Sequence, residues 1–454
     1  MDKHLLMQNL AREANEKNLF TGTWLFAENG EIISKGAVGW RDPDNTLPVL
    51  EDSVFDLASV SKQFTAAAVM LLRRKGLLDL DDEITRFFPA LPYKGVTIRH
   101  LLTHTSGLPD YMNWVCQLAE EENTIPDNSA IIRFLTESGK EPLFQPGEKY
   151  SYCNTGYCVL AEIVEKLSGV KFEDFMRDNI FEPAGMHATR VYHPRKDGIV
   201  IENWARATVY EDGKYILPEV SKKDAYAVPL DGEAGDGYVY SNIFDLLAWD
   251  KVLRAGSLLT PEEQELMYTP WVKIPDYGED DVGYGFGWNI FNAPELGCVL
   301  SHSGGWAGVS TWYGRYLDAN RVMILLCCRD AVDGRGGDAF FPAMSAIGRG
   351  EEPKPLTCIE DITVKEPDKT GWKSFCGKYE PDPDDDYIDE IFMKDGELYA
   401  KVVTEMGYHY ETKLYPLEGN TFGIKEYDVE IAFSDGCMSC DGETVRKHSA
   451  KRTN

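Results

Sequence analysis

The chain has 454 residues, of which 46 are Lys or Arg and 75 are Asp or Glu, so its formal net charge at pH 7 is −29. Because binding to a polyanion gains free energy when Lys and Arg displace counterions, this charge argues against a nucleic acid or an anionic membrane as a partner. Hydrophobic residues make up 43% of the sequence and charged residues 27%, a composition that excludes global disorder and allows a large core.

The first forty residues predict a helix followed by a β-hairpin. Residues 3–18 repeat their apolar side chains at helical spacing. Residues 21–40 predict two strands joined at Asn29-Gly30, a dipeptide typical of two-residue hairpin turns. Because the hairpin follows the helix directly and the sequence has no Gly-rich phosphate loop, this order argues against a parallel nucleotide-binding sheet.

The region up to residue 255 is mainly helical in pattern. An Ala- and Leu-rich helix is predicted to end at Gly76, and a short acidic helix after it is predicted to stop at Pro89. Helices with a clear apolar stripe follow at 161–169 and 241–253, between loops rich in Gly and Pro.

Strand patterns return after residue 283, in four short stretches that are rich in β-branched and aromatic residues and spaced as an antiparallel meander. Strands therefore open and close this part of the chain, and helices fill its middle. This order predicts an α+β domain over residues 1–348, in which the first and last strands share one sheet.

A change of composition at residues 349–369 predicts a linker, because this stretch holds three Pro and many charged residues. After it, residues 370–454 consist almost wholly of short strand patterns, with Asp395-Gly396 as a hairpin turn. About 85 residues of this kind predict a small β-barrel or sandwich domain.

The cysteines and the N-terminus predict a cytoplasmic protein. The N-terminus lacks the apolar stretch of a signal peptide, and no later run is long and apolar enough to span a membrane. The ten Cys are scattered, without the dense even spacing of a disulfide scaffold. Cys437 and Cys440 form a C-x-x-C pair, but no second pair completes a zinc site.

The segment at residues 55–72 suggests nucleophilic chemistry. Ser59 and Lys62 stand three residues apart at the start of a predicted helix, so that Lys62 lies one turn above Ser59 on the same face. The N–H groups and positive dipole end of a helix N-terminus favour negative charge on an attacking oxygen. Acyl transfer needs this combination of a nucleophile, a nearby proton acceptor and oxyanion donors.

The S-x-x-K pattern alone is weak, because chance supplies on the order of one match in a chain of this length. Ser168 and Lys171 also fit it, but they straddle the Gly that ends a predicted helix and would not share a face. The simpler interpretation of Ser59 is a helix N-cap beside a solvated Lys62.

Two further motifs change this balance. Tyr152-Cys153-Asn154 stands just before a predicted helix, and His302-Ser303-Gly304 stands at the end of a predicted strand. The ordered set S-x-x-K, Y-x-N and then K-T-G or H-x-G resembles the serine β-lactamase and penicillin-binding-protein superfamily. It is most similar to the class C-like branch, with its D-aminopeptidases, DD-peptidases and family VIII-type esterases. The resemblance covers about residues 10–345 and includes the sequence segments 101–111, 233–250 and 283–288.

Two other Y-x-N triplets begin at Tyr111 and Tyr240. Neither lies where this family places its catalytic tyrosine, so we expect packing and helix capping there.

The resemblance implies a β-lactamase/transpeptidase-like fold, with an antiparallel sheet flanked by helices, a helical subdomain and a C-terminal all-β barrel-like domain. It also implies that Ser59 attacks a carbonyl group to form an acyl-enzyme, which water then hydrolyses. Lys62 and Tyr152 would share the role of base, either with Tyr152 as a phenolate beside the Lys62 ammonium or with neutral Lys62 as the acceptor. Either form requires a pKa about 2 to 3 units below the usual value near 10.

The remaining roles also follow from the resemblance. Asn154 would orient Lys62 or a substrate amide, and His302 would support Tyr152 or the leaving group. Gly304 and Gly305 would lie beside the substrate, with the N–H groups of Ser59 and Gly305 forming the oxyanion hole. No metal or organic cofactor is implied.

One position departs from the class C β-lactamases, which carry a Lys where this chain has His302. An imidazole is largely neutral at pH 7, so efficient hydrolysis of β-lactams is not expected. We expect an esterase, amidase or D-aminopeptidase-like hydrolase that acts on a small ester, an amide or a D-amino-acid peptide. The alternatives are a β-lactamase or penicillin-binding DD-peptidase and, in another class, a catalytically silent binding protein.

Overall fold

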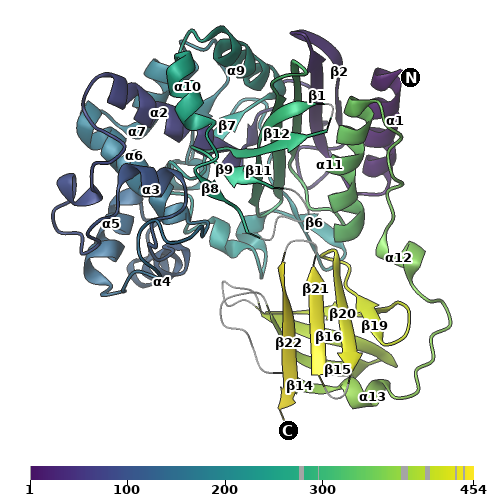
Figure 1. Ribbon diagram of the computed structural model, residues 1–454. Coiled ribbons are helices and arrows are strands. Elements are labelled where there is room, and N and C mark those ends of the chain that lie inside the picture. The colour runs from purple at the N-terminus through teal and green to yellow at the C-terminus, as the bar shows by residue number, and fades with distance from the viewer. Residues whose placement is uncertain are drawn as a thin grey trace.

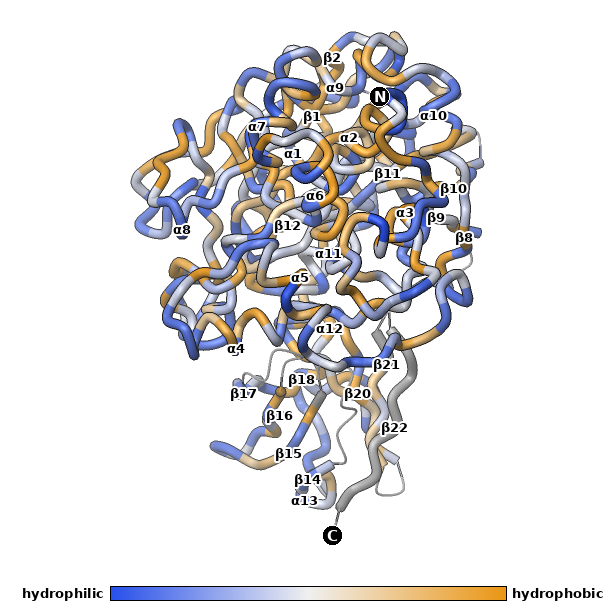
Figure 2. The backbone as a smooth tube through the Cα atoms, turned by 90° about the vertical axis from the view of Figure 1, so that its left-hand side faces the viewer, coloured by the Kyte–Doolittle hydropathy of each residue, from blue (hydrophilic) through white to orange (hydrophobic). Residues whose placement is uncertain are grey.

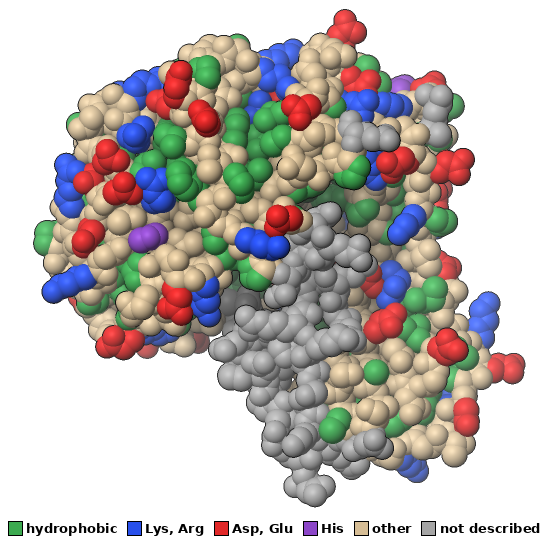
Figure 3. Space-filling model, in the orientation of Figure 1, with side chains coloured by type: hydrophobic (Ala, Val, Ile, Leu, Met, Phe, Trp, Pro, Cys, Tyr) green, Lys and Arg blue, Asp and Glu red, His purple; other side chains and the backbone are tan. Residues whose placement is uncertain are grey.

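The computed structural model describes residues 2–275, 281–294, 296–379, 387–403, 409–434, 437–442 and 445–453. A larger region of helices around a sheet precedes a smaller all-β region, and the two lie one above the other in two views (Figures 1 and 2). This architecture confirms the predicted fold class. On the face shown in Figure 3, acidic side chains are interspersed with basic ones over the larger region.

The central sheet of the larger region is antiparallel throughout. Within the described residues it has eight strands in the order β2-β1-β13-β12-β11-β10-β9-β8. Their bounds are β1 (Gly22–Glu28), β2 (Glu31–Val38), β8 (Val272–Lys273), β9 (Gly283–Tyr284), β10 (Asn289–Ala293), β11 (Gly297–Trp306), β12 (Val309–Tyr316) and β13 (Arg321–Cys327). Because β1 pairs with β13 from Gly22↔Cys327 to Glu28↔Arg321, the helical middle is an insertion between strands of one sheet, as predicted.

The two faces of this sheet bury two separate cores. Along β1, Trp24 and Phe26 point to one face and Leu25 and Ala27 to the other, as the two-residue period of a strand requires. The first face packs against α1 (Lys3–Glu16) and α11 (Gly334–Arg349). The second face packs against the helical middle of the chain.

The helical subdomain is built around α2 (Lys62–Arg74), which is buried from Lys62 to Leu72. Its small Ala side chains allow close contact with α6 (Asn154–Ser168). The other helices of this part are α3 (Ile98–Leu102), α4 (Met112–Glu122), α5 (Asn128–Glu137), α7 (Phe172–Met176), α8 (Pro194–Asp197), α9 (Ile243–Ala255) and α10 (Pro261–Met267). Short strands β3 (Phe55–Asp56), β4 (Arg190–Val191) and β7 (Val239–Ser241) form a small sheet beside them, and β5 (Val209–Glu211) pairs with β6 (Lys214–Ile216).

The prediction of a short acidic helix before Pro89 was wrong, since only a 3₁₀ turn at Ile84–Arg86 forms there. The acidic side chains bind the backbone locally, and Asp82 accepts a hydrogen bond from the N–H of Asp79. The N–H of Ile84 is donated to the carbonyl of Val96, so it is taken by a tertiary contact.

The C-terminal strands form one antiparallel sheet, which has nine strands within the described residues, in the order β17-β16-β15-β14-β22-β21-β20-β19-β18. Its edge strands β17 and β18 are separated in sequence by Leu414 alone, so the two edges approach each other as in a barrel. The bounds are β14 (Gly377–Tyr379), β15 (Tyr387–Lys394), β16 (Glu397–Val403), β17 (His409–Lys413), β18 (Tyr415–Pro416), β19 (Thr421–Gly423), β20 (Val429–Ser434), β21 (Cys437–Gly442) and β22 (Val445–Thr453). Asp395 and Gly396 join β15 to β16 with positive φ, as the hairpin prediction required.

The C-terminal region has its own hydrophobic core, formed by Trp372, Leu398 and Ile431 with their neighbours. Two short helices, α12 (Ile359–Ile362) and α13 (Trp372–Phe375), lie between α11 and β14. Among the described residues, none of the helices has the length and apolar character needed to cross a bilayer.

The loop after β19 docks on the start of α11. The N–H of Gly334 donates to the carbonyl of Lys425 at 2.7 Å, and Arg335 pairs with Asp428 at 2.7 Å. A Cβ atom on Gly334 would lie 2.5 Å from the carbonyl oxygen of Glu426, so only glycine allows this approach.

Candidate active site

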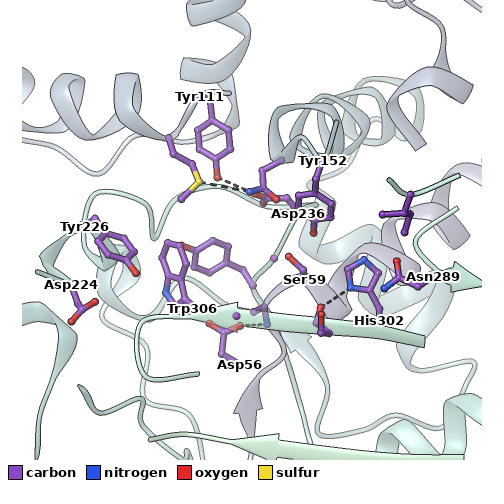
Figure 4. Close-up of a pocket in the computed structure, with 18 of the residues that line it drawn as sticks. Asp56, Ser59, Tyr111, Tyr152, Asp224, Tyr226, Asp236, Asn289, His302 and Trp306 are labelled. Carbon is purple, nitrogen blue, oxygen red and sulfur yellow. Dashed lines mark hydrogen bonds between the residues drawn. The ribbon is translucent and has the colours of Figure 1, made fainter. Parts of the chain in front are cut away.

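A cavity of about 640 Å³ opens between β11 and the helical subdomain (Figure 4). Five of the residues predicted from the sequence line it: Ser59, Tyr152, Asn154, His302 and Gly305. The others lie behind its wall, with Lys62 fully buried beneath Ser59 and Gly304 packed behind the Ser59 turn. Residues from distant parts of the chain, Trp306 from β11 and Tyr427 from the C-terminal region, line the same cavity.

Ser59 lies in a strained turn. The sequence places it at a helix start, and the structure has it in a 3₁₀ turn, Ala58–Ser61, that leads into α2. Ala58 adopts φ +45°, a left-handed conformation that is unfavourable for an L-residue. The buried carboxyl of Asp56 accepts the N–H of Ala58 at 2.8 Å, and the Ser61 hydroxyl accepts the N–H of Val239 at 3.1 Å. These bonds hold the turn in its strained form.

Lys62 is placed to take a proton from Ser59. Its Nζ lies 2.9 Å from Ser59 Oγ, 2.9 Å from Asn154 Oδ1 and 2.7 Å from the carbonyl oxygen of Asp236. The last two atoms are acceptors only, so a neutral amine gives them its two hydrogens and turns its lone pair to the Ser59 hydroxyl. Burial lowers the pKa of Lys62 to about 8, although the Asp236 carboxylate acts to raise it.

Tyr152 faces the same hydroxyl. It forms a hydrogen bond with Ser59, and the Nζ of Lys62 lies 4.9 Å from the centre of its ring. Although the residue is 41% exposed, desolvation raises the pKa of Tyr152, and the hydrogen bond offsets only part of this. Of the two forms left open by the sequence, these environments favour neutral Lys62 with protonated Tyr152 over the phenolate.

Asn154 and His302 play different parts. Asn154 is the first residue of α6, and its side chain contacts Lys62, which is one of the two roles expected for it. His302 lies near Tyr152, with ring centres 6.4 Å apart, but its nitrogens bind other groups. Nδ1 is 2.6 Å from the carbonyl of Ser303, and Nε2 is 2.9 Å from the hydroxyl of Tyr284. Burial and the nearby Lys62 lower the pKa of His302 to about 3, so the ring is neutral.

The two glycines differ in their surroundings. A Cβ atom on Gly304 would overlap the carbonyl oxygen of Leu57 and the hydroxyl of Thr311, and it would lie 3.1 Å from the Cβ of Ala58. A Cβ atom on Gly305 would have no neighbour within 4 Å. Gly304 therefore lets β11 approach the Ser59 turn, and Gly305 faces the cavity.

Sequence reasoning assigned no role to Asp236, His104 or Tyr284, although each lies in a sequence segment that resembles the family. Tyr111 from the first extra Y-x-N triplet donates its hydroxyl to Asp236 Oδ2 at 3.0 Å. Asn242 from the second is the N-cap of α9, accepting the N–H groups of Phe244 and Asp245.

In the pH profile of kcat/KM, the limb that rises with pH is expected to move to lower pH by about one unit when Asp236 is replaced with Asn. With neutral Lys62 as the expected base, activity should rise as pH passes its pKa, and removing the Asp236 charge should lower that pKa. Asp110→Asn is the graded control, because Asp110 raises the pKa of Lys62 less than Asp236 does. A limb that stays in place in Asp236→Asn would contradict Lys62 as the titrating base.

The chain is similar to known proteins over most of its length. A family model described as "Beta-lactamase" matches residues 7–340. Penicillin-binding protein 4* of Bacillus subtilis (strain 168) is 36% identical over 436 residues, covering 96% of this chain and 94% of that protein. Esterase EstB of Burkholderia gladioli is 29% identical over 377 residues, covering 73% and 91%. The octameric penicillin-binding protein homologue from Pyrococcus abyssi has the same fold, with a TM-score of 0.66, 23% identity and coverage of 99% and 100%.

Proposed function

Because the chain belongs to the beta-lactamase family and is a serine hydrolase, we propose that Ser59 is its nucleophile and forms an acyl-enzyme with small esters or amides. The observation that carries this proposal is the 2.9 Å contact between Ser59 Oγ and the buried Nζ of Lys62. An ordinary solvated lysine beside a helix cap would not be buried or have its pKa lowered by desolvation.

In the acylation step, neutral Lys62 takes the proton of Ser59 while Oγ bonds to the substrate carbonyl carbon. The N–H groups of Ser59 and Gly305 stabilise the resulting oxyanion. The carbonyl re-forms and the bond to the leaving group breaks, with the protonated Lys62–Tyr152 pair returning the proton to the leaving oxygen or nitrogen. Water then attacks the acyl-enzyme in the same way and regenerates Ser59.

The cavity supports an ester, an amide or a D-amino-acid peptide as substrate. His302 occupies the position at which related β-lactamases carry a lysine, and with a pKa of about 3 it provides no cation for a substrate carboxylate. Tyr226, Trp306 and Tyr427 add aromatic surface to the wall. The similarity to penicillin-binding protein 4* supports a second candidate function, slow acylation by penicillins.

The chain is further proposed to divide into a hydrolase domain at residues 1–348, a linker at 349–369 and a β-domain at 370–454. The separate core of the β-strands supports this division, and Tyr427 brings the β-domain to the cavity, where it would limit substrate size. A cytoplasmic location is supported by the ten cysteines, which are scattered along the sequence without the dense even spacing of a disulfide scaffold.

Intact-protein mass spectrometry tests the nucleophile and the substrate class together. The protein is incubated with a fluorophosphonate, a penicillin and D-aminoacyl esters, beside Ser59→Ala and the matched control Ser168→Ala. We expect covalent adducts on the wild type and on Ser168→Ala, since Ser168 ends α6 away from the cavity. Full labelling of Ser59→Ala would refute the proposal, and a penicillin adduct that forms slowly and persists would favour the second candidate.

A further inference from the structure

Two histidines and one tyrosine form a continuous buried chain behind the catalytic residues. His104 Nε2 lies 3.1 Å from the hydroxyl of Tyr284, and the same hydroxyl lies 2.9 Å from His302 Nε2. All three side chains are at most 4% exposed. They come from the turn after α3, from β9 and from β11, so the chain joins three separate parts of the fold.

The outer partners of the two rings determine where the protons lie. Nδ1 of His104 accepts the N–H of Cys153 at 3.0 Å, so it carries no hydrogen, and the neutral ring has its hydrogen on Nε2. Nδ1 of His302 faces the carbonyl of Ser303, which can only accept, so this ring has its hydrogen on Nδ1. The hydrogen bonds therefore run in one direction, with His104 donating to Tyr284 and Tyr284 donating to His302.

One other hydroxyl, that of Tyr157, forms a side-chain hydrogen bond with Tyr284. Tyr157 lies beside His104, but its O–H donates to the carbonyl of Leu102 at 2.8 Å. A proton added to His302 Nε2 would meet the Tyr284 O–H, which would then have to turn away from His302 towards the Tyr157 oxygen. These hydrogen bonds thus hold the His302 imidazole in one neutral tautomer by geometry.

The same hydrogen-bonded group also fixes the Tyr152-Cys153-Asn154 segment. His104 accepts the N–H of Cys153 through its ring and the N–H of Ser151 through its carbonyl, at 3.0 and 2.9 Å. Its ring packs against that of Tyr152, with centres 4.2 Å apart and planes tilted by 31°. His104 itself has φ +55°, a conformation that L-residues rarely adopt and that the surrounding bonds must maintain.

We propose that Tyr284 and His104 are positioning residues, which lock the Tyr152 turn to strand β11 and keep His302 neutral beside Lys62. A neutral imidazole leaves Lys62 as the group that changes charge next to Ser59. The groups that face His302 are Lys62 from α2, Tyr284 from β9 with His104 behind it, and Tyr152 from the turn before α6. The effect on catalysis rests on the proposed function, whereas the tautomers do not.

The first test is the ¹⁵N NMR spectrum of histidine-labelled wild-type protein without substrate, with assignments from His104→Asn and His302→Asn. We expect His302 as the Nδ1–H tautomer and His104 as the Nε2–H tautomer, both unchanged between pH 5 and 8. An Nε2–H tautomer or an imidazolium at His302 in this range would overturn the proposal. Because this measurement needs no substrate, its failure is distinct from that of Ser59 as nucleophile, which labelling reports.

The second test is Tyr284→Phe, assayed with a short-chain nitrophenyl ester. Without the hydroxyl, His302 Nε2 loses its donor, and protonation no longer meets an opposing O–H. We expect kcat to fall about tenfold with little change in KM, and His302 to titrate at a higher pH than in the wild type, with a matching upward shift of the acidic limb of kcat/KM. Burial and Lys62 remain in this variant, so the pKa of His302 should stay below its usual value.

The matched control is Tyr316→Phe, which removes the hydroxyl of another buried tyrosine of the same sheet, bonded to Ser345. It should leave the pH profile and the histidine signals unchanged. A Tyr284→Phe protein with the wild-type pH profile, or one whose only change is the loss of stability also seen in the control, would refute the positioning role.

Discussion

Replacing Lys62 with Met is expected to lower kcat/KM by about 1,000-fold or more, because the general base is lost while the shape of the side chain is kept. The pH dependence should change as well. Wild-type activity should rise with pH through about 8, where buried Lys62 becomes neutral, and the residual activity of the variant should lack this limb. The measurement is kcat/KM for a nitrophenyl ester from pH 6 to 10, with circular dichroism to confirm folding.

Lys171→Met is the matched control, since Lys171 completes the second S-x-x-K pattern of the sequence. Its side chain is 72% exposed and pairs with Glu165 at 3.5 Å on the surface. We expect wild-type kinetics for this variant. If Lys62→Met kept the activity and the pH limb of the wild type, Tyr152 would have to act as the base without it.

Gly304→Ala is expected to destabilise the fold by about 3 kcal/mol and to lower kcat by about 100-fold. The added methyl group would overlap backbone at Leu57 and push β11 away from Ala58, the residue before Ser59. The carbonyl of Leu57 is a backbone group, so it cannot rotate aside as a flexible side chain would. Urea unfolding and ester hydrolysis measure the two effects.

Gly305→Ala separates packing from contact with the substrate. Its methyl group would enter open space and would keep the N–H of the proposed oxyanion hole, so the free energy of unfolding should stay near that of the wild type. Any loss of activity in this variant would then report crowding of the substrate. Equal destabilisation of the two variants would mean that β11 does not pack on the Ser59 turn as described.

Much of the fold follows from local patterns in the sequence. The Asn29-Gly30 turn, the helix that ends at Gly169 and the meander after residue 283 form as predicted, because hydrophobic period and turn chemistry are local properties. The acidic helix predicted before Pro89 does not form, and the reason is a non-local contact. Its Ile84 N–H pairs with Val96, a contact that no local pattern contains.

The sequence by itself determined the order of the motifs and hence the candidate residues Ser59, Lys62, Tyr152 and His302. It left open which group is the base, because the pKa of a lysine or tyrosine depends on desolvation and on charges brought near by folding. Only the tertiary structure buries Lys62 beside Asp236, 174 residues away, and ties His302 to His104 through Tyr284. Protonation states are set by such distant neighbours, and a pattern of residue types along the chain does not record them.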